Sequence, residues 1–336
     1  MVAKVSLHDI ATRAGVSVKT VSGALHDSSI RMADDTRARI RAMADELGYI
    51  PNIVARGMRQ GVMPFIGLVA DGLITQPFAT EIMRSLDNTL RPHGLSLIAT
   101  SVGGARGAEA GVVEVRRLMP RAIAFASMYH HVVALPPLTR QAIALMINCR
   151  EESGRVPALA PAERQAAQTI VTHLFARGRR KLAFLNLPGL LAGTLREAGF
   201  RRAHAEHGVA LVEDRIRPAT RGAFYTDLAR SLVASHVGEL LQGAARPDAI
   251  LCGNDRVAME VFAALRRAGA GIPDDIAVAS FDNQIDIATR LDPPLTTMEL
   301  PHRAMGRRAG EILAGLKAPS QQIEEIPFRL VERASV

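Results

Sequence analysis

Residues 7–27 read LHDIATRAGVSVKTVSGALHD, and signals for helix starts and stops are dense in this stretch. Ser6 followed by Asp9 forms a capping-box pattern that begins a helix, and the next glycine ends it. Ser17 is placed to cap a second short helix that begins at Val18. Two short helices joined by a tight turn are the spacing of a helix-turn-helix, whose second helix reads the major groove of DNA.

The residues that follow extend this helical region and then interrupt it. A third helix is predicted from about Ala33 to Leu47, with apolar residues on one face. Residues 51–62 are basic and contain glycine, so this segment alone should be only marginally helical. We therefore expect a helix-turn-helix headpiece over residues 1–50, a hinge over residues 51–62 and a larger body over residues 63–336.

In the body, short apolar runs alternate with helical stretches. The runs are Phe65–Ala70, Leu95–Thr100, Arg121–Ser127, Ala144–Asn148, Leu182–Leu187, Ala249–Cys252 and Ala277–Ser280. This alternation predicts an α/β body of parallel sheets flanked by helices, and the number of elements predicts two lobes with a cleft between them. We place lobe 1 approximately at residues 63–158 and 290–320, and lobe 2 at residues 159–289 and 321–336, with the DPPLTT motif (292–297) as a crossover.

Composition narrows the class of protein. The formal net charge of +8 over 336 residues is compatible with a polyanionic partner. The amino terminus carries no apolar stretch of the signal-peptide type, and no apolar run is suited to a membrane span. Cys149 and Cys252 show neither disulfide-framework nor zinc-ligand spacing. We expect a cytoplasmic protein without a metal or a cofactor.

Residues 7–27, together with DDTRARIRAMADELGYIPNIVARGMRQG (34–61), resemble the headpiece and hinge of the LacI/GalR family of bacterial regulators. The resemblance continues, in the expected order, through FIGLVADGLITQPFATEIMRSLDNTL (65–90), ILCGNDRVAMEVFAALRRAG (250–269), IPDDIAVASFDN (272–283) and DPPLTTMELPHRAMGRRAGEIL (292–313). It implies a periplasmic-binding-protein-like body behind the headpiece. It also implies a sequence-specific transcriptional regulator, most commonly a repressor, that binds a palindromic operator as a homodimer under the control of a small effector.

The second helix of a helix-turn-helix presents short side chains to base edges and phosphates. The candidates here are Ser17, Val18, Lys19, Thr20 and Ser22. Gly23 is expected to face outward as well, where the family commonly has an arginine that grips guanine, so the operator consensus stays open.

The hinge supplies a second set of candidate DNA contacts through the resemblance. In the family, two copies of this segment pair in the minor groove, where the side chain at the Met58 position wedges between base pairs. Arg56 and Arg59 would meet nearby phosphates, and Asn52 belongs to the same DNA-binding segment.

Polar residues that directly follow apolar runs are candidates for a ligand cleft, because such clefts lie at the carboxyl ends of parallel strands. These residues are Asp71, Asn148, Asn254, Asp255 and Asp282. The resemblance assigns the contact with sugar hydroxyls to Asp282, a place in the same cleft to Asp255, the effector-gripping role to Arg196 and an aromatic contact to Phe78. Because a guanidinium holds a carboxylate as well as a hydroxyl, neutral sugars and sugar acids both remain open.

Other classes of protein fit less well. The sequence contains no nucleophile elbow, no phosphate-binding loop and no dinucleotide fingerprint, so an enzyme is not expected. A solute-binding protein with the same two-lobed body would need export and no headpiece. An activator, or a repressor that requires a corepressor, remains an alternative because the sequence does not set the sign of the coupling.

Overall fold

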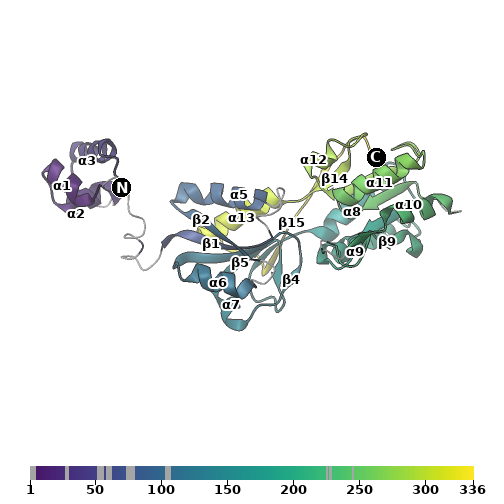
Figure 1. Ribbon diagram of the computed structural model, residues 1–336, viewed down its shortest axis with the longest axis horizontal. Helices are drawn as coiled ribbons and strands as arrows, with labels where there is room; N and C mark the ends of the chain where they lie inside the picture. The colour runs from purple at the N-terminus through teal and green to yellow at the C-terminus, as the bar shows by residue number, and fades with distance from the viewer. Residues whose placement is uncertain are drawn as a thin grey trace. The chain divides into compact units, whose positions relative to one another are not determined.

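The computed structural model describes residues 5–26, 30–50, 57, 63–72, 80–102, 107–224, 226, 229–243 and 246–336. The chain divides into two compact units, Met1–Met63 and Pro64–Val336, which we call the helical unit and the body (Figure 1). Among the described residues, no helix combines the length and the apolar character that a membrane crossing requires.

The helical unit contains α1 (Leu7–Ala14), α2 (Val18–His26) and α3 (Asp34–Glu46). The capping box is present, because the Ser6 side chain accepts a hydrogen bond from the Asp9 backbone N–H and the Asp9 carboxylate accepts one from the Ser6 backbone N–H. Gly15 then ends α1 in the left-handed conformation, with φ 68°. The predicted helix-turn-helix is thus confirmed in its local structure.

A small apolar core holds the three helices together. Ile10 from α1, Val21 and Ala24 from α2 and Ile40 from α3 are all fully buried. The helical spacing of these residues places them on the inner faces, as the periodicity predicts.

One lobe of the body, the first lobe, is built on a six-stranded sheet in the order β15-β7-β5-β3-β1-β2. The strands are β1 (Met63–Asp71), β2 (Ser96–Val102), β3 (Pro120–Ser127), β5 (Ile143–Ile147), β7 (Ala158–Pro161) and β15 (Ile323–Ile326). Its helices are α5 (Thr80–Leu90), α6 (Ala108–Arg116), α7 (Pro137–Ala142) and α13 (His302–Leu313). In Figure 1, α5 and α13 lie side by side over one face of this sheet, and α6 and α7 lie on the other.

The second lobe is built on another six-stranded sheet, in the order β16-β14-β13-β12-β8-β9. The strands are β8 (Leu182–Asn186), β9 (Ile216–Pro218), β12 (Ala249–Cys252), β13 (Ala277–Asp282), β14 (Thr296–Glu299) and β16 (Arg329–Val331). Only β16 is antiparallel to its neighbour among these pairs. The helices of the second lobe are α8 (Glu163–Ala176), α9 (Leu191–Glu206), α10 (Val233–Gln242), α11 (Asp255–Arg267) and α12 (Ile285–Ala288).

Short elements complete the body. They are η2 (Arg91–His93), β4 (Val132–Val133), β6 (Arg150–Glu151), η3 (Glu213–Arg215), β10 (Thr220–Arg221) and β11 (Arg230–Ser231). Strand β4 pairs in parallel with β6, and β10 pairs antiparallel with β11. The predicted class, an α/β body of mainly parallel sheets flanked by helices, is confirmed.

The boundaries of the two lobes in the structure differ from those that we expected from the sequence. Residues 158–161 and 323–326 pair within the first lobe, although most of these positions were predicted to lie in lobe 2. Residues 296–299 pair within the second lobe, although they were predicted to lie in lobe 1. The reason is that strand partners far apart in the sequence, such as β7 and β15, decide which sheet a short strand joins. The DPPLTT motif therefore leads into β14, and the chain crosses between the lobes after Glu299.

Two glycines allow α5 and α13 to pack closely. A Cβ atom at Gly306 would collide with the backbone carbonyl of Ile82, and one at Gly310 would collide with the side chain of Thr89. The close approach buries Leu86 and Met305 completely in the core of the first lobe.

Candidate functional site

The amino-terminal end of α2 carries the predicted DNA-reading side chains. Ser17, Val18 and Lys19 are exposed, and Thr20 and Ser22 are half-buried. The Ser17 hydroxyl accepts a hydrogen bond from the backbone N–H of Thr20 at 3.1 Å, so this residue caps the helix. The first turns of α2 therefore present the exposed side chains of Lys19 and Val18 beside the hydroxyl groups of Ser17, Thr20 and Ser22.

Gly23 does not face outward, contrary to our expectation. It is buried, and a Cβ atom added there would meet the Ile30 side chain. Its backbone carbonyl accepts a hydrogen bond from Arg37 of α3. A larger residue at this position would have to displace Ile30 before it could reach DNA. The hinge candidates Asn52, Arg56, Met58 and Arg59 lie outside the described residues.

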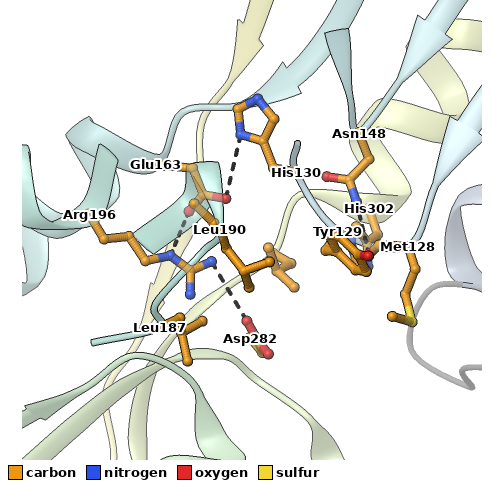
Figure 2. Close-up of a pocket in the computed structure, with 12 residues that line it drawn as sticks. Met128, Tyr129, His130, Asn148, Glu163, Leu187, Leu190, Arg196, Asp282 and His302 are labelled. Carbon is orange, nitrogen blue, oxygen red and sulfur yellow. Dashed lines mark hydrogen bonds and ion pairs between the residues drawn. The ribbon is translucent and has the colours of Figure 1, made fainter. Parts of the chain in front are cut away.

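The body contains a pocket whose lining comes from both lobes (Figure 2). The lining residues from the first lobe and the crossover are Met128, Tyr129, His130, Asn148, Leu300 and His302, and those from the second lobe are Glu163, Leu187, Leu190, Ala192, Arg196 and Asp282. The free volume that these side chains enclose is about 30 Å³, which is room for one or two water molecules. A sugar can therefore enter only when the lining side chains or the lobes move apart.

Arg196 lies at the centre of the polar part of the pocket. Its Nε donates a hydrogen bond to Glu163 at 2.6 Å, its Nη1 donates one to the Gly253 carbonyl at 2.5 Å, and its Nη2 lies 3.8 Å from Asp282. The guanidinium also stacks 4.3 Å over the ring of Phe281. With only 3% of its side chain exposed, Arg196 is held in one position by contacts on several sides.

Glu163 is a pocket residue that the sequence analysis missed. It is the first residue of α8, and only 1% of its side chain is exposed. Burial by itself raises the pKa of Glu163, but the charge of Arg196 and the proximity of His130 outweigh burial, so this pKa lies below its ordinary value. The one available signal was an acidic residue directly after the apolar run ALAPA, at a predicted helix start.

His130 brings the first lobe to the same carboxylate. Its Nδ1 lies 3.8 Å from Glu163 Oε1, which is an ion-pair distance but too long for a hydrogen bond. Neither ring nitrogen of His130 has a hydrogen-bond partner among the residues that the structure describes, although the side chain is only 4% exposed. Figure 2 shows the imidazole, Glu163, Arg196 and Asp282 in a continuous chain across the pocket.

Asn148 and Asp282 line the pocket from opposite lobes, and both have unusual backbone conformations. Their φ angles are 58° and 108°, in a region that residues other than glycine seldom adopt. The Asn148 amide donates hydrogen bonds to the carbonyls of Ser127 and Met128. Burial raises the pKa of Asp282 to about 7, although the Arg196 guanidinium acts in the opposite direction. Strained polar residues at strand ends are typical of ligand sites.

Three other predicted cleft residues do not line this pocket. Asn254 caps α11, because its side-chain oxygen accepts a hydrogen bond from the Val257 N–H. Asp255 accepts hydrogen bonds from Ser280, Thr297 and the Gln284 backbone N–H, and burial raises its pKa to about 6.

Because of these three hydrogen bonds, the Asp255 carboxylate holds the loop that follows Asp282 in place and does not face the cavity. The third of these residues, Asp71, is half-buried, and its carboxylate lies 3.7 Å from Nε2 of His131. Phe78 lies outside the described residues.

The pocket has the chemistry of a binding site. Aliphatic side chains such as Leu187 and Leu190 can cover the carbon framework of a ligand, and the polar groups can exchange hydrogen bonds with hydroxyls. In the described part of the chain, no group of three or more His, Cys, Asp or Glu side chains is placed to hold a metal ion.

Comparisons with known proteins place similarity along nearly the whole chain. Residues 6–52 match the model of bacterial regulatory proteins of the lacI family, and residues 171–336 match the periplasmic binding protein-like domain. The sucrose operon repressor of Escherichia coli is 32% identical over 336 residues, which cover 98% of this chain and 99% of that protein.

Solved structures agree with these matches. A LacI-family transcriptional regulator from Rhizobium etli is 27% identical, with a TM-score of 0.72, over 81% of this chain and 98% of its own. The lac repressor dimer bound to operator and the anti-inducer ONPF is 23% identical, with a TM-score of 0.77, over 99% of both chains, and supports the fold.

Proposed function

Since the chain belongs to the LacI family of bacterial regulatory proteins, it is a transcriptional repressor of that family, and we propose that it binds a palindromic operator as a homodimer under the control of a sugar-type effector. This class of protein regulates transcription and is not an enzyme. We further propose that it acts in the cytoplasm, where operator DNA is found.

Operator reading is assigned to residues 1–50 and the hinge at residues 51–62. Lys19 and Val18 are exposed on α2 and are proposed to contact base edges, while Ser17 and Thr20 contact phosphates from the helix start. Two such helices related by a two-fold axis would read the two halves of a palindrome.

Effector binding is assigned to the pocket of the body. The observation that carries this assignment is the convergence of Asn148, Glu163, Arg196 and Asp282 on one buried cavity from two lobes. Carboxylate, amide and guanidinium groups are suited to paired hydrogen bonds with vicinal hydroxyls. The sucrose operon repressor supports a sugar or a sugar derivative as the class of effector.

Selection of binding sequences from a randomised duplex library tests the DNA half of the proposal. We expect a palindromic consensus, two protein chains per duplex in sedimentation analysis, and an affinity that falls steeply with salt concentration. A sugar that raises the melting temperature of the protein should also change the affinity for the selected duplex. A consensus without two-fold symmetry, or binding that is insensitive to salt, would contradict the proposal.

A further inference from the structure

Acidic groups outnumber the arginine in the pocket. Among its described lining residues, Glu163 and Asp282 contribute carboxyl groups and Arg196 contributes the guanidinium. Tyr129, His130 and His302 are the other titratable side chains that face this space.

The positive charge of Arg196 is already paired with acidic and polar groups of the protein itself. The guanidinium donates hydrogen bonds to the Glu163 carboxylate and to the Gly253 backbone carbonyl. The Asp282 carboxyl group lies at ion-pair distance from it. A carboxylate or phosphate on a ligand would have to displace Glu163 from this arrangement. It would then lie beside the ionised Glu163 and the carboxyl group of Asp282 in a buried site, where like charges repel strongly.

We infer that this pocket accepts an uncharged polyol and excludes sugar acids and sugar phosphates, and that Glu163 sets this selectivity. The inference rests on the proposed effector-binding function and narrows the class of effector. Glu163 is the appropriate carboxylate for this role because its pKa lies below the ordinary value, so it is ionised at neutral pH, whereas Asp282 has a pKa of about 7.

The remaining polar groups favour hydroxyls. The ring nitrogens of His130 lack hydrogen-bond partners among the described residues, and the imidazole can donate or accept according to its tautomer. A hydroxyl is both a donor and an acceptor, so it can satisfy this buried ring without adding charge. An anion would satisfy only a donor on the ring and would approach the Glu163 carboxylate that lies 3.8 Å from it.

Matched ligand pairs test the inference on the full-length protein. We would measure thermal stabilisation, and then titration calorimetry at pH 7.5, for glucose against gluconate and glucose 6-phosphate, galactose against galacturonate, and sucrose against sucrose 6-phosphate. At least one neutral sugar should bind, and its charged partner should bind on the order of 100-fold more weakly. A charged partner that binds as tightly as the neutral sugar would overturn the inference.

Glu163→Gln tests the role of the residue itself. In a folded variant, as judged by circular dichroism, the preference for the neutral partner should shrink by at least about 10-fold, because Arg196 then has a charge to offer to an anion. Glu206→Gln removes an exposed carboxylate from α9, the helix that carries Arg196, and should leave the preference unchanged. An unchanged preference in Glu163→Gln would overturn the role of Glu163, and the wild-type comparison decides the charge selectivity even if that variant does not fold.

Failure of the inference differs measurably from failure of the proposed function. Binding of acids or phosphates alone would overturn charge selectivity and leave a regulator with an anionic effector. Binding of neither set would overturn both this inference and the sugar-type effector. Operator binding by the same preparation would still report on the DNA half of the proposal.

Discussion

Arg196→Met should destabilise the body because it leaves a buried carboxylate without its cation. The guanidinium and the Glu163 carboxylate are 2.6 Å apart, and their side chains are 3% and 1% exposed. Removing one partner of such a pair typically destabilises a protein by about 3–5 kcal/mol, because the remaining charge is buried and unpaired. For a body that spans Pro64–Val336, that loss corresponds to a fall in Tm of roughly 5–9 °C.

The double variant Arg196→Met/Glu163→Gln should be more stable than Arg196→Met alone. Once both charges are removed, no unpaired carboxylate remains at this position, and about 2 kcal/mol or more should be recovered. Lower pH should also relieve Arg196→Met, since Glu163 without its cation can take up a proton.

Calorimetry of the full-length wild type, the two single variants and the double variant gives the coupling between the two side chains. The matched control is Arg202→Met with Glu206→Gln, an exposed pair on the same helix with side chains 61% and 49% exposed. Its coupling should be only about 0.3–0.5 kcal/mol. If the effects of Arg196→Met and Glu163→Gln add to within about 0.5 kcal/mol, the reasoning about this buried pair is wrong.

Four further predictions concern other parts of the chain. Asp282→Asn should gain stability relative to wild type as the pH rises from about 4 to about 8, as thermal melts at both pH values would show. The folded-state pKa of Asp282 is raised to about 7, so its carboxyl costs the wild type nothing below the ordinary pKa of 3.8 and at most roughly 4 kcal/mol by neutral pH. Gly306→Val should lower stability by about 1–3 kcal/mol through its clash with α5, whereas Gly238→Ala, at an open position of α10, should be neutral or stabilising in the same urea titration. Ser17→Ala should destabilise the helical unit by about 1 kcal/mol and weaken operator binding measured by anisotropy, and a stability equal to wild type would contradict the capping role. Met58→Gly should weaken operator binding and spare effector binding in calorimetry, and unchanged operator affinity would exclude the wedge role.

Local signals made the helical unit predictable. The start of α1 depends on Ser6 and Asp9, and the start of α2 depends on Ser17, all within a few residues of the helices that they cap. Long apolar runs identified the central strands in the same way. Gly23 was misplaced because its burial depends on Ile30, which approaches from the segment leading into α3.

The pocket was only partly predictable, because the strand-end rule gives the position of a residue and not the direction of its side chain. Asp282 and Asp255 both follow apolar strands, yet one faces the cavity and the other bonds to Ser280 and Thr297. Glu163 was missed for a related reason. Its importance arises from the packing of α8 against α9, which brings it to Arg196, 33 positions away in the chain.

The row of polar side chains across the pocket, from His130 through Glu163 and Arg196 to Asp282, also indicates how the proposed effector would regulate this protein. A ligand shifts a conformational equilibrium only by the difference in its affinity for the two states. Because His130 and Asn148 come from the first lobe and Arg196 and Asp282 from the second, a ligand that contacts both sets loses contacts when the lobes separate. Two lost hydrogen bonds, at about 1 kcal/mol each, correspond to roughly a 30-fold difference in affinity between the two arrangements, which lies within the usual range for allosteric coupling. Glu163 contacts both lobes through His130 and Arg196, so we expect its substitution to change this coupling as well as the charge selectivity.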